Sequence, residues 1–186
     1  MRKNQANSVT LVLGGVRSGK SRYAQELAER FARVTFVATA EPRQDEEMRR
    51  KIERHRAARP PHWTTVEETT ALGRVLRAGE EDCDAILIDC LTLFAANLLE
   101  TFGGDAPGLE TRVDQLCAAL ETTSRSVILV SNEVGSGVVP AYALGRRFRD
   151  LLGEINQRVA AVADTVVLLV AGLPLVLKGS GERGQP

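Results

Sequence analysis

The sequence predicts an α/β domain whose largely parallel sheet is covered by helices on both faces. Apolar, β-rich runs alternate with segments of helical periodicity, and strands joined through helices pair in parallel. A strand, helix, strand unit opens the chain within residues 9–40. The 186 residues allow one domain with a substantial core and are too few for two full domains.

Short apolar runs bounded by glycine or polar residues predict buried strands. They lie at 9–13, 34–40, 64–68, 84–89 and 126–135. Apolar residues that recur every three or four positions predict helices. These lie at 21–32, in the charged segment after Pro42 up to "RPP", at 70–77, 90–101 and 109–122, and from Pro140 to about Ala163.

The remaining segments are predicted to be a loop, a strand pair and two ends outside the fold. "GGDAPG" at 103–108 is expected as an exposed loop, and "DTVVLLVAGLPLVLK" as two β runs broken at Gly172 to Pro174. We expect an N-terminal extension at 1–8, a single catalytic domain at 9–178 and a flexible tail at 179–186.

Composition favours a small ligand over a nucleic acid. The 24 basic and 24 acidic residues give a pI near 6.8, whereas an electrostatic nucleic-acid binder would show a basic excess. No apolar run approaches the ~20 residues of a membrane helix, and "MRKNQANS" lacks the apolar core of a signal peptide. The three cysteines have neither disulfide-framework nor zinc-site spacing. We therefore expect a cytoplasmic enzyme with no membrane span.

The stretch "GGVRSGKS" at 14–21 fits G-x-x-x-x-G-K-[ST], follows a predicted strand and opens a predicted helix. In such a P-loop, main-chain N–H groups converge on phosphate oxygens at a helix N-terminus. Lys20 would reach the β- and γ-phosphates, and Ser21 would hold Mg²⁺. The alternative is a glycine turn that happens to precede a lysine.

Asp89 ends the apolar strand "AILID". A carboxylate at the carboxyl end of a strand beside the P-loop is what a nucleotide site needs to hold the Mg²⁺ shell. The alternative is a surface aspartate at a strand end.

Two histidines are available for imidazole chemistry, and they differ in context. His62 lies in "PPHW", at a rigid turn, and is expected to be structural. His55 shares a helix face with Met48 and Ile52, which favours a core or interface position. A neutral imidazole there would also be nucleophilic, and Arg56 and Arg59 could clamp a phosphate or simply form a solvated basic face. These residues alone indicate a P-loop nucleotide enzyme with an unknown acceptor.

A more specific signal comes from several segments taken together. They are "LGGVRSGKS", "FVATA", "DEEMRRKIERHRAARPPHWTTVEE", "ILIDCLTLFAANLL", "VSNEVGSGVVP" and "RRFRDLLGEINQRVAAVAD". In this order, over about residues 9–178, they resemble the bifunctional adenosylcobinamide kinase/adenosylcobinamide-phosphate guanylyltransferases of cobalamin biosynthesis.

The resemblance implies a RecA-like P-loop domain, assembled as a homotrimer, that catalyses two reactions. ATP or GTP first phosphorylates a hydroxyl of adenosylcobinamide. GTP then donates GMP to adenosylcobinamide phosphate, which gives adenosylcobinamide-GDP and pyrophosphate. The family's guanylylated histidine falls on His55, in "KIERHRAARP".

The resemblance also implies which residues contact the nucleotide. They are Gly14, Gly15, Val16, Arg17, Ser18, Gly19, Lys20, Ser21, Ala38, Thr39, Ala40, Arg56, Ala57, Ala58, Arg59, Glu67 and Asp89. Glu67 could accept hydrogen bonds from guanine N1–H and N2–H, and Ser21 and Asp89 would hold Mg²⁺. Two rival hypotheses remain open: a plain small-molecule P-loop kinase in which His55 is structural, and a non-enzymatic, RecA-like nucleotide-dependent interaction module.

Overall fold

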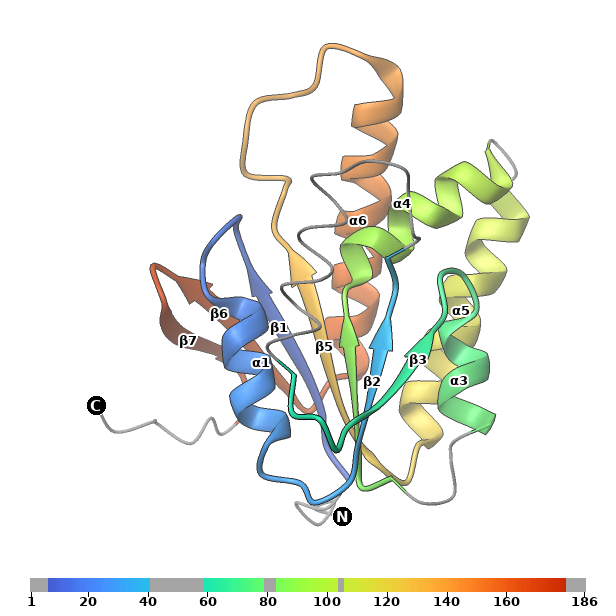
Figure 1. The fold of residues 1–186 in the computed structure, drawn as a ribbon. Helices are drawn as coiled ribbons and strands as arrows, with labels where there is room; N and C mark the ends of the chain where they lie inside the picture. The colour runs from blue at the N-terminus through green and yellow to red at the C-terminus, as the bar shows by residue number, and fades with distance from the viewer. Residues whose placement is uncertain (1–6, 41–58, 79–82, 104–105, 180–186) are drawn as a thin grey trace.

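A computed structural model describes residues 7–40, 59–78, 83–103 and 106–179. Its sheet has seven strands in the order β3-β2-β4-β5-β1-β6-β7 (Figure 1). The strands are β1 (Val9–Gly14), β2 (Val34–Ala38), β3 (Thr64–Glu67), β4 (Ala85–Asp89), β5 (Ser126–Asn132), β6 (Thr165–Val170) and β7 (Leu173–Lys178). All neighbouring strands pair in parallel except β6 and β7, which form an antiparallel hairpin. The predicted α/β class, with its C-terminal strand pair, is confirmed.

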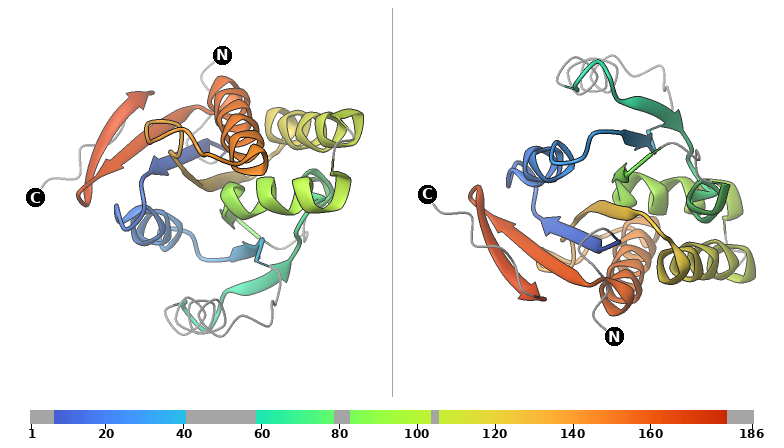
Figure 2. Two further views of the ribbon diagram at one scale, coloured as in Figure 1. Left: turned by 90° about the horizontal axis from the view of Figure 1, so that it is seen from above. Right: turned by 90° about the horizontal axis from the view of Figure 1, so that it is seen from below.

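Helices cover the sheet on both faces. They are α1 (Lys20–Ala28), α3 (Leu72–Ala78), α4 (Leu91–Phe102), α5 (Ala106–Thr122) and α6 (Ala143–Val162). Seen from above and below, α1 lies on one side of the sheet and α4, α5 and α6 lie on the other (Figure 2). Two buried clusters match this division. Ala24 and Ala28 of α1 pack with one, whereas apolar residues of α3, α4, α5 and α6 form the other.

The structure corrects the predicted starts of two helices. The helix predicted from Pro140 begins at Ala143, because the preceding residues fold back over its first turn, where Arg146 donates to the carbonyl oxygens of Pro140 and Ala141 at 3.0 and 2.8 Å. The loop predicted at 103–108 is shorter, because α5 begins at Ala106 and its first turn tolerates Pro107.

The turn between the two C-terminal β runs also lies earlier in the chain than the predicted break at Gly172 to Pro174. Ala171 and Gly172 make the turn, with φ angles of 51° and 83°. Pro174 belongs to β7, where an edge strand tolerates the missing N–H group.

Strand alternation decides which side chains reach the site. In β4 and β5, Ala85, Leu87, Ile128 and Val130 pack in the α1-side cluster, while Ile86, Ile88, Val127 and Leu129 pack on the other face. Successive side chains of a strand point to opposite faces. The next residues of the α1-facing series, at the carboxyl ends of these strands, are Asp89 and Asn132.

Candidate nucleotide-binding site

The P-loop joins the carboxyl end of β1 to the N-terminus of α1, as the sequence predicts. Arg17 and Gly19 have positive φ angles of 58° and 95°, a conformation that turns main-chain N–H groups toward one concave surface. Lys20 Nζ donates to the carbonyl oxygen of Gly15 at 3.0 Å, so the lysine side chain lies back along the loop. Convergent N–H groups, a helix N-terminus and a lysine form a site for a polyanion.

Close packing at the start of the loop requires glycine at one of its two leading positions. A Cβ on Gly14 would lie 2.3 Å from Ser18 Oγ and 2.9 Å from the carbonyl oxygen of Leu169, whereas a Cβ on Gly15 would meet nothing within 4 Å. Ser18 Oγ is buried and has no hydrogen-bond partner among the described residues. A glycine-lined cradle beside an unpaired hydroxyl fits a ligand rich in phosphate oxygens.

The β6–β7 hairpin supports the P-loop from the other end of the chain. Gly172 N donates to the carbonyl oxygen of Ser18 at 2.9 Å. A Cβ on Gly19 would lie 3.4 Å from Gly172 Cα. The left-handed turn of the hairpin therefore braces the loop's centre, a contact that links residues far apart in the sequence.

The strand ends bring most of the predicted residues to one edge of the sheet. Ala38 is in register with both Asp89 and Glu67, and Gly14 is in register with Asn132. Asp89 ends β4, and β5 lies between β4 and the P-loop strand β1. A place for Asp89 in the Mg²⁺ shell stays a prediction. Asp89 still faces the α1 side, to which the P-loop leads.

Thr39 joins the ends of β2 and β4. It is fully buried, and its Oγ1 accepts from Cys90 N at 2.7 Å and donates to Cys90 O at 2.8 Å. Asn97 of α4 donates to Thr39 O at 2.8 Å. These bonds place Ala38 and Ala40 beside Asp89 through the main chain, and the Thr39 hydroxyl itself is used within the fold.

Two adjacent acids at the end of β3 have different environments. Glu68 accepts hydrogen bonds from the main-chain N–H groups of Thr70 and Ala71, at 3.0 and 2.8 Å, and pairs with Arg74 at 3.0 Å. Burial would raise its pKa, but these bonds outweigh burial and lower it. Glu67 is exposed at the strand end, so of the two acids it is the one available to a ligand.

Comparison with known proteins adds the chemistry that the fold alone does not specify. The sequence profile of the family "Cobinamide kinase / cobinamide phosphate guanyltransferase" matches residues 10–177. The chain belongs to this family.

Named relatives of the cobinamide kinase/guanylyltransferase family align over almost their whole length. The bifunctional adenosylcobalamin biosynthesis protein CobP of Pseudomonas aeruginosa is 46% identical over 170 residues, which cover 91% of this chain and 96% of that protein. The corresponding protein CobU of Salmonella typhimurium is 41% identical over 179 residues, covering 90% and 98%.

Solved structures share the fold at low sequence identity. A prototypical ATPase from the type III secretion system of pathogenic bacteria has a TM-score of 0.59 at 16% identity, covering 87% of this chain and 51% of that one. The assembled ATPase EscN of enteropathogenic E. coli has a TM-score of 0.59 at 14% identity, covering 90% and 43%. This likeness confirms the RecA-like P-loop architecture that the family resemblance implied.

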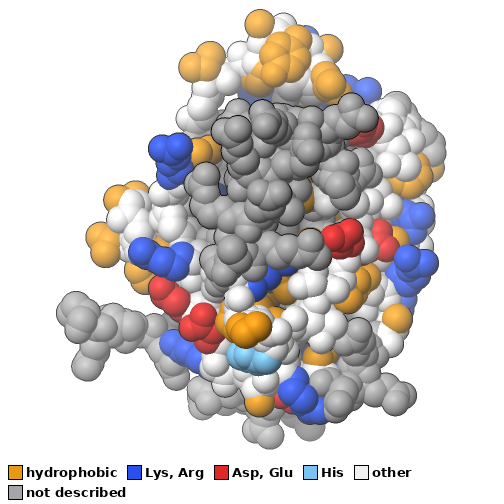
Figure 3. All heavy atoms as spheres, in the orientation of Figure 1, with side chains coloured by type: hydrophobic (Ala, Val, Ile, Leu, Met, Phe, Trp, Pro, Cys, Tyr) orange, Lys and Arg blue, Asp and Glu red, His pale blue; other side chains and the backbone are white. Residues whose placement is uncertain are grey.

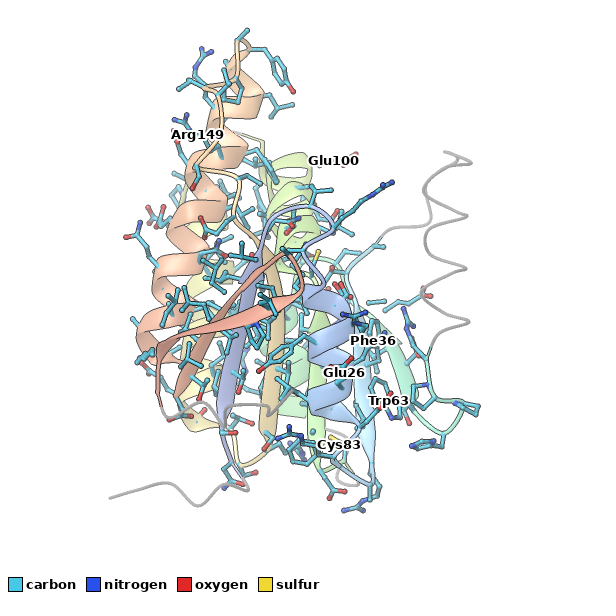
Figure 4. The ribbon with its side chains drawn as sticks, turned by 90° about the vertical axis from the view of Figure 1, so that its left-hand side faces the viewer. Glu26, Phe36, Trp63, Cys83, Glu100 and Arg149 are labelled. Carbon is cyan, nitrogen blue, oxygen red and sulfur yellow. The ribbon has the colours of Figure 1, made fainter. Side chains whose placement is uncertain are left out.

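Some of the residues implied by the family resemblance lie outside the described ranges, namely His55, Arg56, Ala57 and Ala58. Arg59 is described, and its guanidinium lies 3.5 Å from the centroid of the Phe36 ring, with Nη1 donating to Thr65 Oγ1 at 3.5 Å. Phe36 and Trp63 lie in the cluster beside α1 (Figure 4). Arg59 is thus placed against the middle of β2, and a phosphate contact from it stays a prediction.

The thiol that follows Asp89 offers no competing nucleophile. Burial, and after it the charge of Asp89, raise the pKa of Cys90 to about 11. Cys90 is therefore a neutral thiol near pH 7.

The donor set at the strand edge suits Mg²⁺ bound together with a nucleotide. Ser21 and Asp89 offer hard oxygen donors, and Mg²⁺ commonly takes one or two protein oxygens while phosphates and water complete its shell. Within the described ranges, no group of three or more His, Cys, Asp or Glu side chains could hold a metal ion alone. The donors present fit a metal that arrives with phosphate ligands.

Two asparagines near this edge were not predicted as site residues. Asn132 ends β5, and Asn156 of α6 donates to Asn132 O at 3.0 Å and to Glu133 Oε1 at 3.1 Å. The signal was present, because "SNE" directly follows a buried apolar run and ligands bind at the carboxyl ends of parallel strands. Only the topology shows that this run lies next to the P-loop strand.

Proposed function

We propose that this chain catalyses two successive reactions, phosphorylation of adenosylcobinamide and transfer of GMP from GTP to the resulting adenosylcobinamide phosphate. The family match over residues 10–177 is the observation that carries the proposal. The P-loop, with Glu67 and Asp89 at the same edge of the sheet, supplies the geometry for a nucleotide substrate. A non-enzymatic interaction module is not favoured, since the family is defined by two transferase activities.

In the kinase step, the adenosylcobinamide hydroxyl oxygen forms a bond to the γ-phosphorus of ATP or GTP. The bond from that phosphorus to the β–γ bridging oxygen breaks, the nucleoside diphosphate leaves and the hydroxyl proton is released. The P-loop N–H groups and Lys20 bind the phosphates and stabilise the charge that develops on them. Ser21 and Asp89, the latter partly through water, would hold Mg²⁺, which neutralises phosphate charge when bound.

In the guanylyl step, a neutral nitrogen of His55 attacks the α-phosphorus of GTP. The bond to the α–β bridging oxygen breaks, pyrophosphate leaves toward the P-loop, and a phosphoramidate forms on His55. A phosphate oxygen of adenosylcobinamide phosphate then displaces the imidazole. The products are adenosylcobinamide-GDP and free His55.

Glu67 is our candidate for guanine selection in the second step. An exposed carboxylate at the end of β3 could accept from guanine N1–H and N2–H, whereas adenine presents no such donor pair. Glu67→Gln should raise the KM for GTP in the guanylyl step. Glu100→Gln on α4 is the matched control. An unchanged preference for GTP over ATP in Glu67→Gln would exclude this assignment.

The decisive experiment for the proposed function uses GTP labelled with ³²P at the α-phosphate, together with Mg²⁺. Wild type should acquire an acid-labile, base-stable label that His55→Ala lacks, while His62→Ala, which removes the other histidine, keeps it. Phosphorylation of adenosylcobinamide should survive His55→Ala and fall with Lys20→Ala. Phosphorylation without label on wild type would indicate the plain kinase, and label retained on His55→Ala would place the nucleophile elsewhere.

We also propose a homotrimer, the assembly that the family resemblance implies, and two exposed apolar surfaces suit contact between subunits. All six residues of edge strand β7 are exposed, including Leu173 at 72%. Hydrophobic side chains also gather at the top of the molecule (Figure 3), where Val138, Tyr142 and Leu144 are exposed between β5 and the first turn of α6. Edges and patches of this kind are usually covered in an assembly. Size-exclusion chromatography of the whole chain, coupled to light scattering, should give the mass of three chains.

The domain and location expected from the sequence stay proposals. We propose residues 9–178 as one catalytic domain, which the family match and the common sheet support. Within the described ranges no helix combines the length and apolar character needed to cross a bilayer. The cytoplasmic location remains a prediction from the sequence.

A further inference from the structure

The turn of the β6–β7 hairpin lies against the centre of the P-loop (Figure 1). Gly172 N donates to the carbonyl oxygen of Ser18 at 2.9 Å, and a Cβ on Gly19 would lie 3.4 Å from Gly172 Cα. The P-loop is one contiguous segment near the start of the chain, whereas Gly172 lies in its last strand pair. The nucleotide contacts implied by the family resemblance do not include Gly172.

The hairpin turn is anchored to the strand that leads into the P-loop. β6 pairs in parallel with β1 as far as Leu169 and Gly14, and the chain then turns at Ala171 and Gly172. These two residues have φ angles of 51° and 83°. A non-glycine residue such as Ala171 rarely adopts a positive φ, and such conformations persist where surrounding contacts impose them, often at functional sites. The turn is therefore held in one conformation beside the loop.

The hydrogen bond to Ser18 O comes from outside the P-loop. Gly15 O, by comparison, accepts from Ser18 N at 3.3 Å and from Lys20 Nζ at 3.0 Å, both within the loop. A Lys20 side chain that moves to a bound phosphate would leave Gly15 O. The bond from Gly172 uses no group that a nucleotide needs, so it can persist in the nucleotide-bound state.

The Ser18–Gly19 peptide needs an outside contact because glycine leaves its orientation open. In a trans peptide the C=O and N–H groups point in opposite directions. Gly19 has no Cβ and can adopt either sign of φ, so this peptide could rotate and turn its N–H group away from a ligand. With Ser18 O bound to the hairpin, Gly19 N–H faces away from the hairpin. Gly19 is the N-cap of α1, and N–H groups at a helix N-terminus have no partner within the helix.

We propose that Gly172 is a positioning residue for nucleotide binding, which holds the Ser18–Gly19 peptide so that Gly19 N–H donates to a β-phosphate oxygen. This inference rests on the proposed nucleotide site and adds to it a residue from the C-terminal hairpin. Gly172 acts through Ser18 and Gly19 and does not itself touch the phosphate. A donor that is already oriented needs no reorganisation when the ligand arrives, so more of its hydrogen-bond energy contributes to affinity.

The first test compares substitutions that oppose or tolerate a positive φ at residue 172. Valine strongly disfavours this conformation, and asparagine is among the residues that adopt it most readily. A Cβ on Gly172 would lie 3.9 Å from Arg22 Nη2, so space limits neither substitution. Gly172→Val should bind GDP with Mg²⁺ about tenfold more weakly than wild type, the loss expected for one hydrogen bond to a charged group. Gly172→Asn should recover most of that affinity. GMP, which has no β-phosphate, should bind all three proteins within about threefold.

Gly103→Val is the matched control. Gly103 also has a positive φ, 58°, and its N–H group donates to a main-chain oxygen, Leu99 O, at 2.9 Å, but it ends α4 on the other face of the sheet. Gly103→Val should lose thermal stability and keep the wild-type affinity for GDP. A purely structural Gly172 predicts the same result for Gly172→Val, namely a lower Tm with unchanged GDP affinity. That outcome would overturn the inference, as would equal losses for GDP and GMP.

Amide hydrogen exchange tests the same contact in the wild-type protein. Coupling is reciprocal, so a contact that strengthens GDP binding by some factor is strengthened by GDP by the same factor. Exchange of Gly172 N–H should therefore slow by about tenfold when GDP and Mg²⁺ are added, while exchange of Gly103 N–H stays the same. Unchanged exchange at Gly172 would overturn the inference, and this measurement remains decisive if Gly172→Val fails to fold.

The same measurements separate this inference from the function beneath it. If wild type binds neither GDP nor a non-hydrolysable GTP analogue, the proposed nucleotide site fails. If wild type binds GDP and folded Gly172→Val binds it equally well, only the positioning role of Gly172 fails.

Discussion

Gly14→Ala should destabilise the protein, because no space exists for a methyl group at the start of the P-loop. The new Cβ would lie 2.3 Å from Ser18 Oγ and 2.9 Å from Leu169 O. The serine hydroxyl can rotate away, but the Leu169 carbonyl belongs to β6, which is paired with β1 at this residue. Overpacking of this kind costs about 1–3 kcal/mol, and a domain of this size loses about 2–4 °C in Tm per kcal/mol. The expected fall in Tm is therefore about 2–12 °C.

Gly15→Ala is the matched control, since its Cβ would meet nothing within 4 Å. An open site of ordinary φ gains about 0.4–1 kcal/mol from the more restricted unfolded chain, so its Tm should stay level or rise slightly. Adding Ser18→Ala to Gly14→Ala should recover only the part of the loss due to the hydroxyl. Thermal unfolding followed by circular dichroism measures all four proteins. Equal Tm values for Gly14→Ala and Gly15→Ala would refute the packing argument.

Three further predictions concern the polar contacts that hold the strand ends. Glu68→Ala should lower the free energy of unfolding by about 1 kcal/mol, because two main-chain N–H groups at the start of α3 lose their acceptor. Folding lowers the pKa of Glu68. The stability difference between wild type and Glu68→Ala should therefore be full at pH 7 and shrink as the pH falls below about 4.5 toward the folded pKa. The same difference in urea unfolding at pH 7 and at pH 3 would contradict this. Asn97→Ala should lower the free energy of unfolding in urea by about 1–3 kcal/mol, because Asn97 is 3% exposed and its Nδ2 donates to Thr39 O and Thr69 O. A loss no larger than that of an exposed substitution such as Gln157→Ala would count against this. Ser131→Ala should cost a similar amount by leaving Asn156 Oδ1 unpaired, and a neutral effect on urea unfolding would show that the Ser131–Asn156 bond contributes little.

The elements that the sequence predicted well are those with local causes. Apart from Thr10, the run "VTLVL" is apolar because β1 is buried on both faces. β4 ends at Asp89, where its apolar pattern ends. The predicted start of α6 failed because a side-chain contact decides it, and apolar periodicity does not report such contacts. Arg146 folds residues 140 and 141 over the first turn of α6, and no local pattern shows that contact.

The candidate site divides in the same way. Gly14 through Ser21 are identifiable from sequence because the P-loop is one contiguous segment whose residue types follow from main-chain geometry. Glu67 and Glu68 are adjacent acids that sequence cannot rank. The structure separates them, because Glu68 accepts from the N–H groups of Thr70 and Ala71 and Glu67 does not.

By itself, then, the sequence determined the α/β class, the phosphate-binding loop and the family, because periodicity and contiguous motifs are local properties of the chain. The tertiary structure alone decided the strand order, which inserts β5 between the P-loop strand and the strand of Asp89. It also decided that Asn132 is in register with Gly14 and has a buried oxygen without a hydrogen-bond partner in the part of the chain that the structure describes. The contact between Gly172 and Ser18 is likewise a tertiary one. The physical reason is that parallel pairing joins residues far apart in sequence, and the order of pairing is set by how all the helices and strands share one core.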